Sequence, residues 1–588
     1  YGIMEEIETD DGYIENNGLY INALTKSKSL ALSIIDLLAT VGIFGTLGKK
    51  IIQSGKYKGN IYYKVILTGE EVIKFYKNVG FLSTDKQERL EKVIDDSSSK
   101  SRSQTKDIIP NFGNILNEII NDLDLKQKRN TWQRKFAAEM RGKTQRQRAG
   151  RLYLKNKAHF LDRLYQEKNK QPGKDLEWLK NLTNSDIFWD RIENVEVVYK
   201  DSSVYDIGTD DGHFILANGN LIAHNSEILK DAVEVSPRGL YTSGKGSTAV
   251  GLCVSGDSNV YLSNDMVPIS NIVESEFQKG NAHRYNENIR FKENSTNHKL
   301  LNSNNLKIKH DSISKVWKIK SPSKLIKITT RTGRELKLTK QTPVLSIDEN
   351  EGLIWKPSKH LNISDRVATL RRLKTSSIKT PPSLYKLIKD YPNSLYIYNI
   401  KRKVRDAIYT IKKKLNLTDK QLADEFNVSE STIHRWKKSN DKFGFSLKHL
   451  KRISSLLNEN VEKFLPDRID VQIKRGQTIS LPKNLNGDWF YLLGLIVGDG
   501  RVSIHNHEGG YGGVTIGFSN QQQILLEKFK SFFEKLNLNV NITEKSENRP
   551  SEYRVFSSLI YHIFSKFGLS ESPKSSNIDL NPQIIYYP

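Results

Sequence analysis

The chain has 588 residues, with 91 Lys and Arg against 67 Asp and Glu and a net charge of +24. Such a cationic excess favours a polyanionic partner such as nucleic acid, because Lys and Arg displace the counterions of phosphates. The single cysteine, Cys253, excludes an internal disulfide and a CxxC metal site, and without a secretory signal or a membrane-spanning apolar run we expect a cytoplasmic protein with no membrane partner.

Residues 1–100 and 485–588 show the same order of predicted elements. The first copy opens with GIMEEIETDDG, followed by a helical pattern over 30–41, a strand pattern over 61–67 and a helix from Glu70. The second copy opens with LLGLIVGDG, followed by a Gly-rich hairpin pattern, a helix, a strand and a closing helix. Self-similarity at such a long separation predicts two copies of one α+β unit.

The stretch LLGLIVGDG resembles the motif of the LAGLIDADG homing endonuclease family. The resemblance implies paired helices whose last acidic residues hold a divalent cation, here Mg²⁺, at the scissile phosphates of double-stranded DNA. Asp499 takes that position in the later copy, and Val497 replaces an inner Asp that is not a metal ligand. In the early copy either Asp10 or Asp11 matches the acid. The alternative for both copies is an ordinary helix ending in an Asp-Gly cap.

The region 101–185 differs in composition from its neighbours. SSSKSRSQTK indicates a polar linker, and RGKTQRQRAGRLYLKNK has a basic helical pattern. Two interpretations remain equal here: an arm that contacts DNA phosphates, or a solvated helix face.

Short alternating strands are predicted over 186–225, which ends in HFILANGNLIAHN. This stretch resembles the C-terminal splicing blocks of inteins. The resemblance implies that the Asn225 side-chain amide attacks its own carbonyl and cuts the chain, while His224 and His213 assist. It also implies that Ser226 supplies the hydroxyl that accepts the upstream acyl group.

Residues 226–252 contain SPRGLYTSGKGSTAVGL, which resembles part of the ATPase core of archaeal minichromosome maintenance (MCM) replicative helicases. The resemblance implies a hexameric, ATP-dependent host in which Ser226 becomes the Mg²⁺–ATP-binding hydroxyl of the phosphate loop after splicing. The stretch GLYTSGK at 239–245 imitates a phosphate loop. However, Gly246 follows it where Ser or Thr is needed, so we interpret it as helicase framework.

Residues 253–374 open with CVSGDSNVYLSNDMVPISNIV, which resembles the N-terminal splicing block of inteins. The resemblance implies that Cys253 attacks the preceding carbonyl and forms a thioester. Thr339 fits the Thr of the second splicing block, but Thr342 stands where the family has a His that helps to protonate the scissile amide. His360 is a candidate replacement for that His.

A helical domain is predicted over 395–465, where KLNLTDKQLADEFNVSESTIHRWKKSN resembles a helix-turn-helix of the phage-repressor type. Five apolar side chains are spaced to pack two helices across a tight turn: Leu422, Ala423, Phe426, Val428 and Ile433. Ser429 is predicted to cap the second helix. The resemblance implies four DNA-contacting residues: Ser431, Thr432, His434 and Arg435. The alternative is an ordinary helical hairpin.

Together these predictions describe a multidomain α+β protein with all-β Hint-type splicing halves, LAGLIDADG repeats and a small all-α helix-turn-helix domain. The leading hypothesis is a fragment of an MCM precursor interrupted by two inteins, whose partners include the missing intein halves. The alternative is a free-standing LAGLIDADG endonuclease or a helix-turn-helix regulator without splicing. Residues 186–225 and 253–374 would belong to different inteins, so we expect them to dock poorly. If they docked, their order would release or cyclise 226–252.

Overall fold

The computed structural model describes residues 20–98, 107–125, 148–224, 253–373, 382–544 and 551–584, apart from short gaps inside these ranges. The first LAGLIDADG acid candidates, Asp10 and Asp11, and the junction residues Asn225 and Ser226 lie outside the described residues. No helix in the described part is long and apolar enough to cross a membrane.

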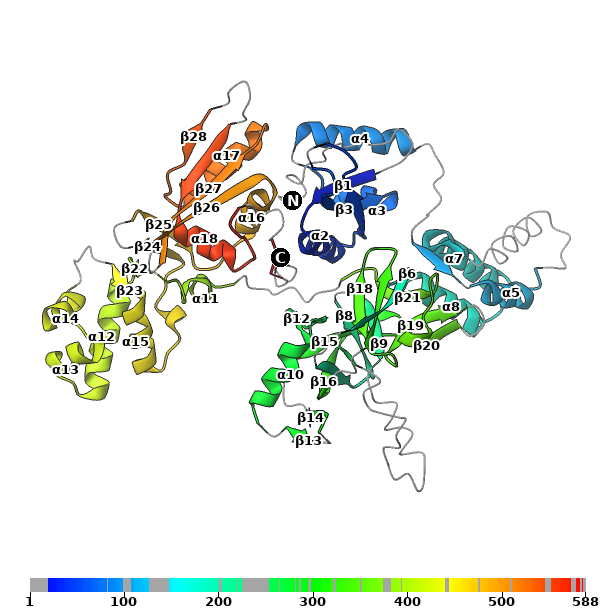
Figure 1. Ribbon diagram of the computed structural model, residues 1–588, viewed down its shortest axis with the longest axis horizontal. Coiled ribbons are helices and arrows are strands. Elements are labelled where there is room, and N and C mark those ends of the chain that lie inside the picture. The colour runs from blue at the N-terminus through cyan, green and yellow to red at the C-terminus, as the bar shows by residue number, and fades with distance from the viewer. Residues whose placement is uncertain are drawn as a thin grey trace.

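The largest sheet has 16 strands from both sides of 226–252, and its strands are the cyan and green arrows at the lower right of Figure 1. Four of its strands precede that segment: β6 (Ile187–Tyr199), β7 (Val204–Thr209), β8 (His213–Leu216) and β9 (Leu221–His224). The others follow it: β10 (Val254–Ser255), β11 (Asn259–Tyr261), β12 (Met266–Pro268), β13 (His283–Arg284), β14 (Ile289–Glu293), β15 (Lys299–Asn304), β16 (Lys307–Ile319), β17 (Lys324–Thr330), β18 (Glu335–Leu338), β19 (Pro343–Asp348), β20 (Gly352–Pro357) and β21 (Arg366–Leu370). Helix α10 (Ile269–Gln278) and the short η2 (Ser358–His360) complete this unit.

The strands of the two sides alternate within the sheet. Strand β6 lies between β21 and β17, β7 lies between β10 and β16, and β9 lies between β8 and β19. The expectation that the two halves dock poorly is therefore wrong. The physical reason is that each half leaves unpaired strand edges and alternating apolar residues, which the other half covers. One core contains Ile207, Phe214 and Leu221 from the first half with Val260 and Leu336 from the second.

The predicted repeat is present at the two ends of the described chain. The later copy consists of α16 (Gly487–Asp499), β26 (Gly500–His507), β27 (Gly510–Ser519), α17 (Gln523–Lys535), β28 (Asn541–Thr543), β29 (Glu552–Phe556) and α18 (Ser558–Ser565). The early copy consists of β1 (Tyr20–Thr25), α2 (Lys28–Thr40), β2 (Thr46–Ile51), β3 (Ile61–Thr68), α3 (Glu70–Asn78) and α4 (Thr84–Ser98). Strand order β27-β29-β28 in the one matches β1-β3-β2 in the other, and both sheets are antiparallel.

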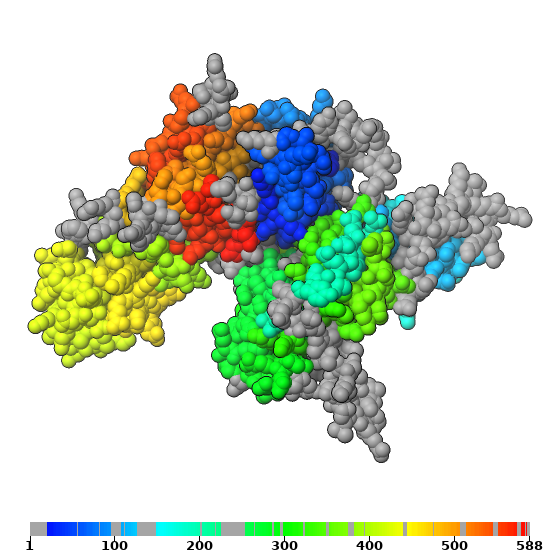
Figure 2. Space-filling model, in the orientation of Figure 1, coloured from blue at the N-terminus to red at the C-terminus, as the bar shows by residue number. Residues whose placement is uncertain are grey.

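The two copies pack against each other although they stand at opposite ends of the sequence. In Figure 2 the blue early copy lies against the orange and red later copy, and both contribute to one apolar core. Ser27 Oγ donates to the carbonyl of Ile578 at 2.7 Å, and Gln522 Nε2 donates to Ser83 Oγ at 2.7 Å. The paired arrangement that the LAGLIDADG resemblance implies is thus compatible with the fold.

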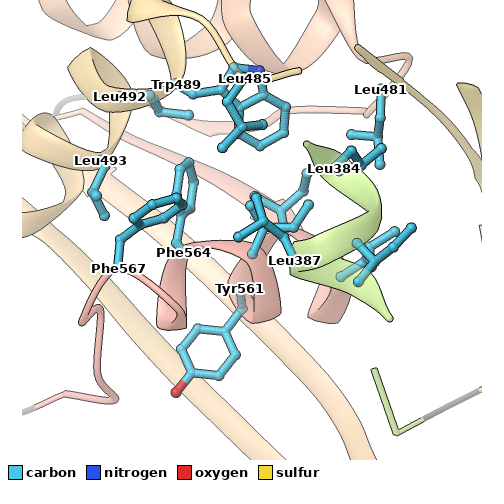
Figure 3. Close-up of a cluster of buried hydrophobic side chains, with 14 of the residues drawn as sticks. Leu384, Leu387, Leu481, Leu485, Trp489, Leu492, Leu493, Tyr561, Phe564 and Phe567 are labelled. Carbon is cyan, nitrogen blue, oxygen red and sulfur yellow. The ribbon is translucent and has the colours of Figure 1, made fainter. Parts of the chain in front are cut away.

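The unit with the predicted helix-turn-helix is not all-α, which corrects that part of the fold prediction. Its helices are α11 (Leu384–Ile388), α12 (Lys401–Leu415), α13 (Asp419–Phe426), α14 (Glu430–Lys437), α15 (Leu447–Leu457) and η3 (Val461–Lys463). Its strands form the sheet β23 (Phe445–Ser446), β22 (Leu395–Ile397), β24 (Arg468–Ile473) and β25 (Thr478–Pro482). Figure 3 shows Leu384 and Leu387 of α11 facing Trp489 and Phe564 of the later copy, so this unit is anchored to it.

The described parts of the basic region, 107–125 and 148–185, pack on the 16-stranded sheet, whereas nearly all of the predicted linker SSSKSRSQTK lies outside the described residues. They contain β4 (Ile108–Pro110), α5 (Gly113–Asp122), β5 (Arg148–Gly150), α7 (Arg151–Glu167) and α8 (Lys174–Thr183). Leu161 and Leu179 share a core with Trp189 of β6. Arg151 is buried, bonded to Asp107 (3.0 Å) and the carbonyl of Leu182 (2.6 Å), so its guanidinium is not a DNA phosphate contact.

Candidate functional site

Cys253 lies fully buried just before β10, enclosed by two threonines. Its backbone N–H donates to Thr339 Oγ1 at 3.0 Å, and Thr342 Oγ1 donates to the Cys253 carbonyl at 2.9 Å. The two hydroxyl oxygens are 2.9 Å apart. Because the Thr342 proton points at the carbonyl, Thr339 must donate to Thr342. A directed chain of hydrogen bonds therefore runs from the Cys253 N–H through Thr339 and Thr342 to the Cys253 carbonyl, and it fixes the nitrogen that would leave in an attack by the Cys253 thiol.

The backbone around the threonines is fixed by further hydrogen bonds. Thr339 N–H also donates to the Cys253 carbonyl at 2.9 Å, and buried Ser358 bonds Thr339 O (2.7 Å) and Thr342 O (2.9 Å). His360, the candidate replacement for the family's His, is exposed at the end of η2. The residue that contacts Cys253 is thus Thr342 itself, and the exposed His360 does not take over its position.

His213 and His224 form the second cluster, on the neighbouring strands β8 and β9. They are register partners with ring centroids 6.2 Å apart, and the Trp355 indole of β20 lies 5.4 Å from His213 and 4.9 Å from His224. The His213 ring nitrogens face the carbonyls of Asp211 (2.8 Å) and Ser303. These contacts fix the His213 ring, which lies next to the His224 ring on the adjacent strand.

The two clusters flank one short stretch of chain, 338–344. Leu338 pairs with Val254, Thr339 and Thr342 contact Cys253, and Val344 pairs with Ala223, the neighbour of His224. The sequence-predicted residues Cys253, Thr339, His213 and His224 are therefore brought to one region of the sheet, although Cys253 and His224 are separated by the whole of 226–252.

Sequence reasoning missed a buried ion pair that connects this region to the early repeat copy. Arg334 Nη2 lies 2.8 Å from Asp36 Oδ1, and both residues are buried. Burial lowers the pKa of Arg334, but Asp36 together with Tyr261 and Asp190 outweighs burial, and the pKa of Arg334 is raised. The Asn220 amide oxygen, in the orientation that satisfies its neighbours, accepts from Arg334 at 2.8 Å while its NH₂ donates to Tyr261 Oη at 2.6 Å.

The ion pair lies close to the His224 strand, because Asn220, which bonds Arg334, directly precedes β9. The early repeat copy also contacts the splicing sheet at two further points: Leu47 N–H donates to Thr332 O at 2.9 Å, and the ring centroids of Phe44 and Phe188 are 4.3 Å apart. Gly333 has a φ of +82°, and a Cβ there would lie 2.8 Å from the Leu47 carbonyl oxygen. No local sequence pattern predicts this interface between the early repeat copy and the splicing sheet, since its residues are distant in the chain.

Asp499 stands at the end of α16, as predicted. It is half-buried, and its Oδ2 accepts from Asn520 Nδ2 at 2.9 Å. Gly500 has an ordinary φ of −74°, but a Cβ there would lie 2.6 Å from the backbone of Ile496, so close approach explains this glycine. Within the described ranges no group of three His, Cys, Asp or Glu side chains could hold a metal ion. A metal site at Asp499 would need a further acid, such as Asp10 or Asp11.

The four predicted DNA-contacting residues lie on α14. Ser431, His434 and Arg435 are exposed and Thr432 is partly exposed. The predicted core is confirmed, with Val428 half-buried and the other four side chains buried. Ser429 is the N-cap residue, but its hydroxyl bonds the Ser431 and Thr432 hydroxyls rather than a backbone N–H.

Lowering the pH below about 4 is expected to reduce the stability of helices α13 and α14. Hydrogen bonds from Lys412 and then Lys437 lower the pKa of Asp419 to about 2. An aspartate with a depressed pKa stabilises the fold above its unfolded pKa of about 3.9, and this stabilisation is lost as pH falls from about 4 to 2. Hydrogen exchange of α13 and α14, followed by mass spectrometry across this window, checks the prediction. Asp419→Asn should remove the pH dependence, whereas exposed Asp424→Asn should preserve it.

Comparison with known proteins matches two parts of this structure. Residues 260–551 match the model of the intein splicing domain, and residues 11–80 match the model of a LAGLIDADG-like domain. The chain carries an intein splicing domain and a LAGLIDADG-like domain. The first match supports the splicing blocks after Cys253, and the second covers the early repeat copy, where the motif is looser.

Two curated proteins of Methanocaldococcus jannaschii are similar to parts of the chain. The replication factor C small subunit is 32% identical over 128 residues, which are 21% of this chain and 6% of that protein. The RNA polymerase subunit Rpo1C is 24% identical over 228 residues, which are 38% of this chain and 24% of that protein. The chain thus spans only a small part of either relative, and neither name identifies the protein that would surround an intein splicing domain here.

Proposed function

We propose that the chain is a section of an intein-bearing precursor that performs autocatalytic splicing chemistry on both sides of 226–252. The observation that carries this proposal is the interleaving of strands from both sides in one sheet, with Cys253 and His224 beside the shared stretch 338–344. A free-standing endonuclease or DNA-binding regulator would have no use for this arrangement.

Each junction residue has a defined role in this proposal. The Cys253 thiol attacks the Leu252 carbonyl and its proton passes to the departing nitrogen of Cys253, which the Thr339–Thr342 chain holds in position because Thr339 Oγ1 accepts the N–H of that nitrogen. The Ser226 hydroxyl then accepts the acyl group. Asn225 cyclises onto its own carbonyl and breaks the bond to Ser226.

At this second junction His224 is the assisting group. Trp355 restricts its ring on one side, and His213 orients it from β8. Removal of His213 should therefore act through the position of His224 rather than on Asn225 directly.

We also propose a homing endonuclease activity for the paired repeat copies. Double-stranded DNA would lie across them, with Asp499 and either Asp10 or Asp11 as ligands for Mg²⁺. Bound at such a site, Mg²⁺ supplies charge stabilisation at the scissile phosphate. Asn520 holds the Asp499 carboxylate in position, and Ser431, Thr432, His434 and Arg435 on α14 would contact the major groove.

The host protein is proposed to be an MCM replicative helicase, on the strength of SPRGLYTSGKGSTAVGL within 226–252. After splicing, Ser226 would complete the phosphate loop and bind Mg²⁺–ATP in a hexamer. The chain itself lacks the phosphate-loop Lys, so ATP turnover by the isolated chain would contradict this assignment.

The splicing proposal is tested by intact mass of the purified chain with and without added thiol. We expect scission after Asn225 without thiol and thiol-induced scission after Leu252. Asn225→Ala should abolish only the first and Cys253→Ala only the second. A wild-type chain that remains uncut under all these conditions would refute the splicing proposal.

The endonuclease proposal is tested with a plasmid library in Mg²⁺ buffer. We expect linear products with the wild-type chain and none with Asp499→Asn, while binding to the DNA is retained. The matched control is Asp488→Asn, an exposed aspartate in the first turn of the same helix, which should leave cleavage unchanged. Equal cleavage by wild type and Asp499→Asn would contradict the proposed role of Asp499.

A further inference from the structure

The hairpin β15–β16 covers the turn that leads into β8 and His213. Strand β16 pairs with β7, which precedes that turn, and β15 contacts β8, which follows it. Two polar side chains of the hairpin are buried here: Asn302 is 0% exposed and Asp311 is 7% exposed. Burial of a carboxylate is costly unless hydrogen bonds satisfy it, so the partners of Asp311 indicate what it holds in place.

A first chain of hydrogen bonds runs from Asp311 through Asp211 to Nδ1 of His213. Asp311 Oδ2 accepts from the backbone N–H of Asp211 at 3.0 Å, and the carbonyl of Asp211 lies 2.8 Å from His213 Nδ1. The Asp211 carboxylate in turn binds Lys309 and accepts from Asn304 Nδ2 at 3.2 Å. The bond from Lys309, and then the bond from Asn304, lower the pKa of Asp211. The ionised side chain therefore ties the turn to the hairpin.

A second chain of hydrogen bonds runs from Asp311 through the other strand of the hairpin to Nε2 of His213. Asp311 Oδ2 accepts from Asn302 Nδ2 at 2.9 Å, and Asn302 Oδ1 accepts from the backbone N–H of Ser303 at 2.6 Å. The carbonyl of Ser303 faces His213 Nε2. The other carboxylate oxygen of Asp311 accepts from the backbone N–H of Ser312 at 2.9 Å. Both oxygens of this carboxylate are thus occupied by N–H donors.

We propose that Asp311 is a positioning residue, whose carboxylate holds the carbonyls of Asp211 and Ser303 against the two ring nitrogens of His213. Asp211, Asn302, Ser303 and Asp311 are called the His213 clamp below. The inference rests on the proposed splicing function and deepens it, because His213 and His224 are register partners with ring centroids 6.2 Å apart. Asp311 acts on the Asn225 junction only through these two rings.

The clamp also restricts the chemistry that is open to His213. A carbonyl oxygen only accepts hydrogen bonds, so each contact requires a proton on the ring nitrogen that it faces. Neutral imidazole has one ring proton and the imidazolium ion has two. Both contacts are therefore satisfied only around the protonated ring, which has no lone pair with which to take a proton. Within the clamp, His213 fixes the neighbouring His224 ring rather than acting as a base.

The clamp is tested first by NMR of the chain with ¹⁵N-labelled histidine, in a Cys253→Ala, Asn225→Ala background that keeps the chain whole. At about pH 5, below the ordinary histidine pKa of about 6.5, both ring nitrogens carry protons. Ring N–H groups that face water exchange these protons too fast to give a signal. We expect two protected ring N–H signals from His213, assigned by their absence in His213→Gln.

Three variants show whether Asp311 holds the ring. Asp311→Leu should remove both protected signals, because both chains of hydrogen bonds begin at its carboxylate. Asn302→Ala cuts only the chain through Ser303 and should remove the Nε2 signal alone. The matched control is Glu293→Leu, which removes an exposed carboxylate from β14, the strand beside β16, and should keep both signals.

The junction reactions give a second measurement, in the chain with its native junctions. Asp311→Leu should slow scission after Asn225 by roughly tenfold, since a misplacement of about 1 Å can cost up to about 10²-fold in rate. Thiol-induced scission at Cys253 should keep its rate, which a general folding defect would not allow. Asp311→Asn should retain most of the Asn225 rate, because its amide oxygen can still accept from Asp211 and Asn302.

The outcomes separate this inference from the function on which it rests. If both ring signals remain in Asp311→Leu, or if scission slows equally at the two junctions, the positioning role is refuted. If the signals respond as expected but no bond breaks in the native chain, the clamp stands and the splicing function is refuted. Should Asp311→Leu fail to fold, Asn302→Ala decides the question, since a retained Nε2 signal in that variant refutes the inference.

Discussion

Replacing Asp36 with alanine is expected to lower the free energy of opening at the contact between the early repeat copy and the splicing sheet by about 3 kcal/mol. The substitution leaves the buried guanidinium of Arg334 without its carboxylate partner, 2.8 Å away in the native protein. An uncompensated buried charge is costly, whereas the intact pair itself contributes little net stability. Native-state hydrogen exchange of α2 and β18 measures the change, in a Cys253→Ala, Asn225→Ala background that prevents self-cleavage.

Two controls make this prediction specific. Asp162→Ala removes the carboxylate of a partly exposed pair with Lys180, and should cost less than about 1 kcal/mol. The double variant Asp36→Leu, Arg334→Met removes the buried charge together with its partner and should recover most of the lost stability. If Asp36→Ala and Asp162→Ala had equal effects, the buried pair would not have the role assigned to it.

Thr342→Val is expected to slow thioester formation at Cys253 by about tenfold, because a buried hydrogen bond that positions the reacting amide contributes roughly 1.4 kcal/mol, which corresponds to a factor of about ten in rate. Valine has nearly the shape of threonine but lacks the hydroxyl that bonds Thr339 at 2.9 Å and the Cys253 carbonyl at 2.9 Å. The rate is measured as thiol-induced scission after Leu252 in the Asn225→Ala background, where the second junction is silent.

Conservative variants distinguish chemistry from packing at this position. Thr342→Ser keeps the hydroxyl and should restore most of the rate. Thr342→His supplies the residue that inteins usually carry, and should give a rate that changes with pH near the pKa of imidazole, at about 6.5. A Val variant as fast as the wild type would show that the hydroxyl chain to the Cys253 nitrogen has no part in the reaction.

The local elements were largely predictable from sequence. The helical pattern over 30–41 became α2, the apolar stretch before Gly500 became α16, and the five apolar residues of the predicted helix-turn-helix pack as their spacing predicted. Hydrophobic period and capping residues determine such elements over a few turns, so a single sequence contains enough information. The two repeat copies also have the same strand order, as their prediction as copies of one unit requires.

The long-range arrangement was not predictable in the same way. Arg334 and Asp36 are 298 positions apart, and their sequence neighbourhoods contain no signal that they meet. The expectation that β6–β9 dock poorly with the strands after Cys253 rests on their assignment to two inteins, whereas the unpaired strand edges and apolar faces determine the docking. The sheet β23-β22-β24-β25 was missed because its strands are short and separated by helices. Residue roles at Asp10, Asp11, Asn225 and Ser226 stay predictions.

The Asp36–Arg334 pair also has a consequence for how such a gene can decay. The charge of Arg334 in the splicing sheet is neutralised by Asp36, which belongs to the LAGLIDADG-like part. Arg334 also contacts Asn220 in the turn that leads into β9. If the proposed DNA cleavage were no longer under selection, mutations that destabilise α2 would still reduce splicing and so the amount of mature host protein. Selection on the host would therefore preserve α2 and its surroundings, and the endonuclease fold would persist after its activity had gone.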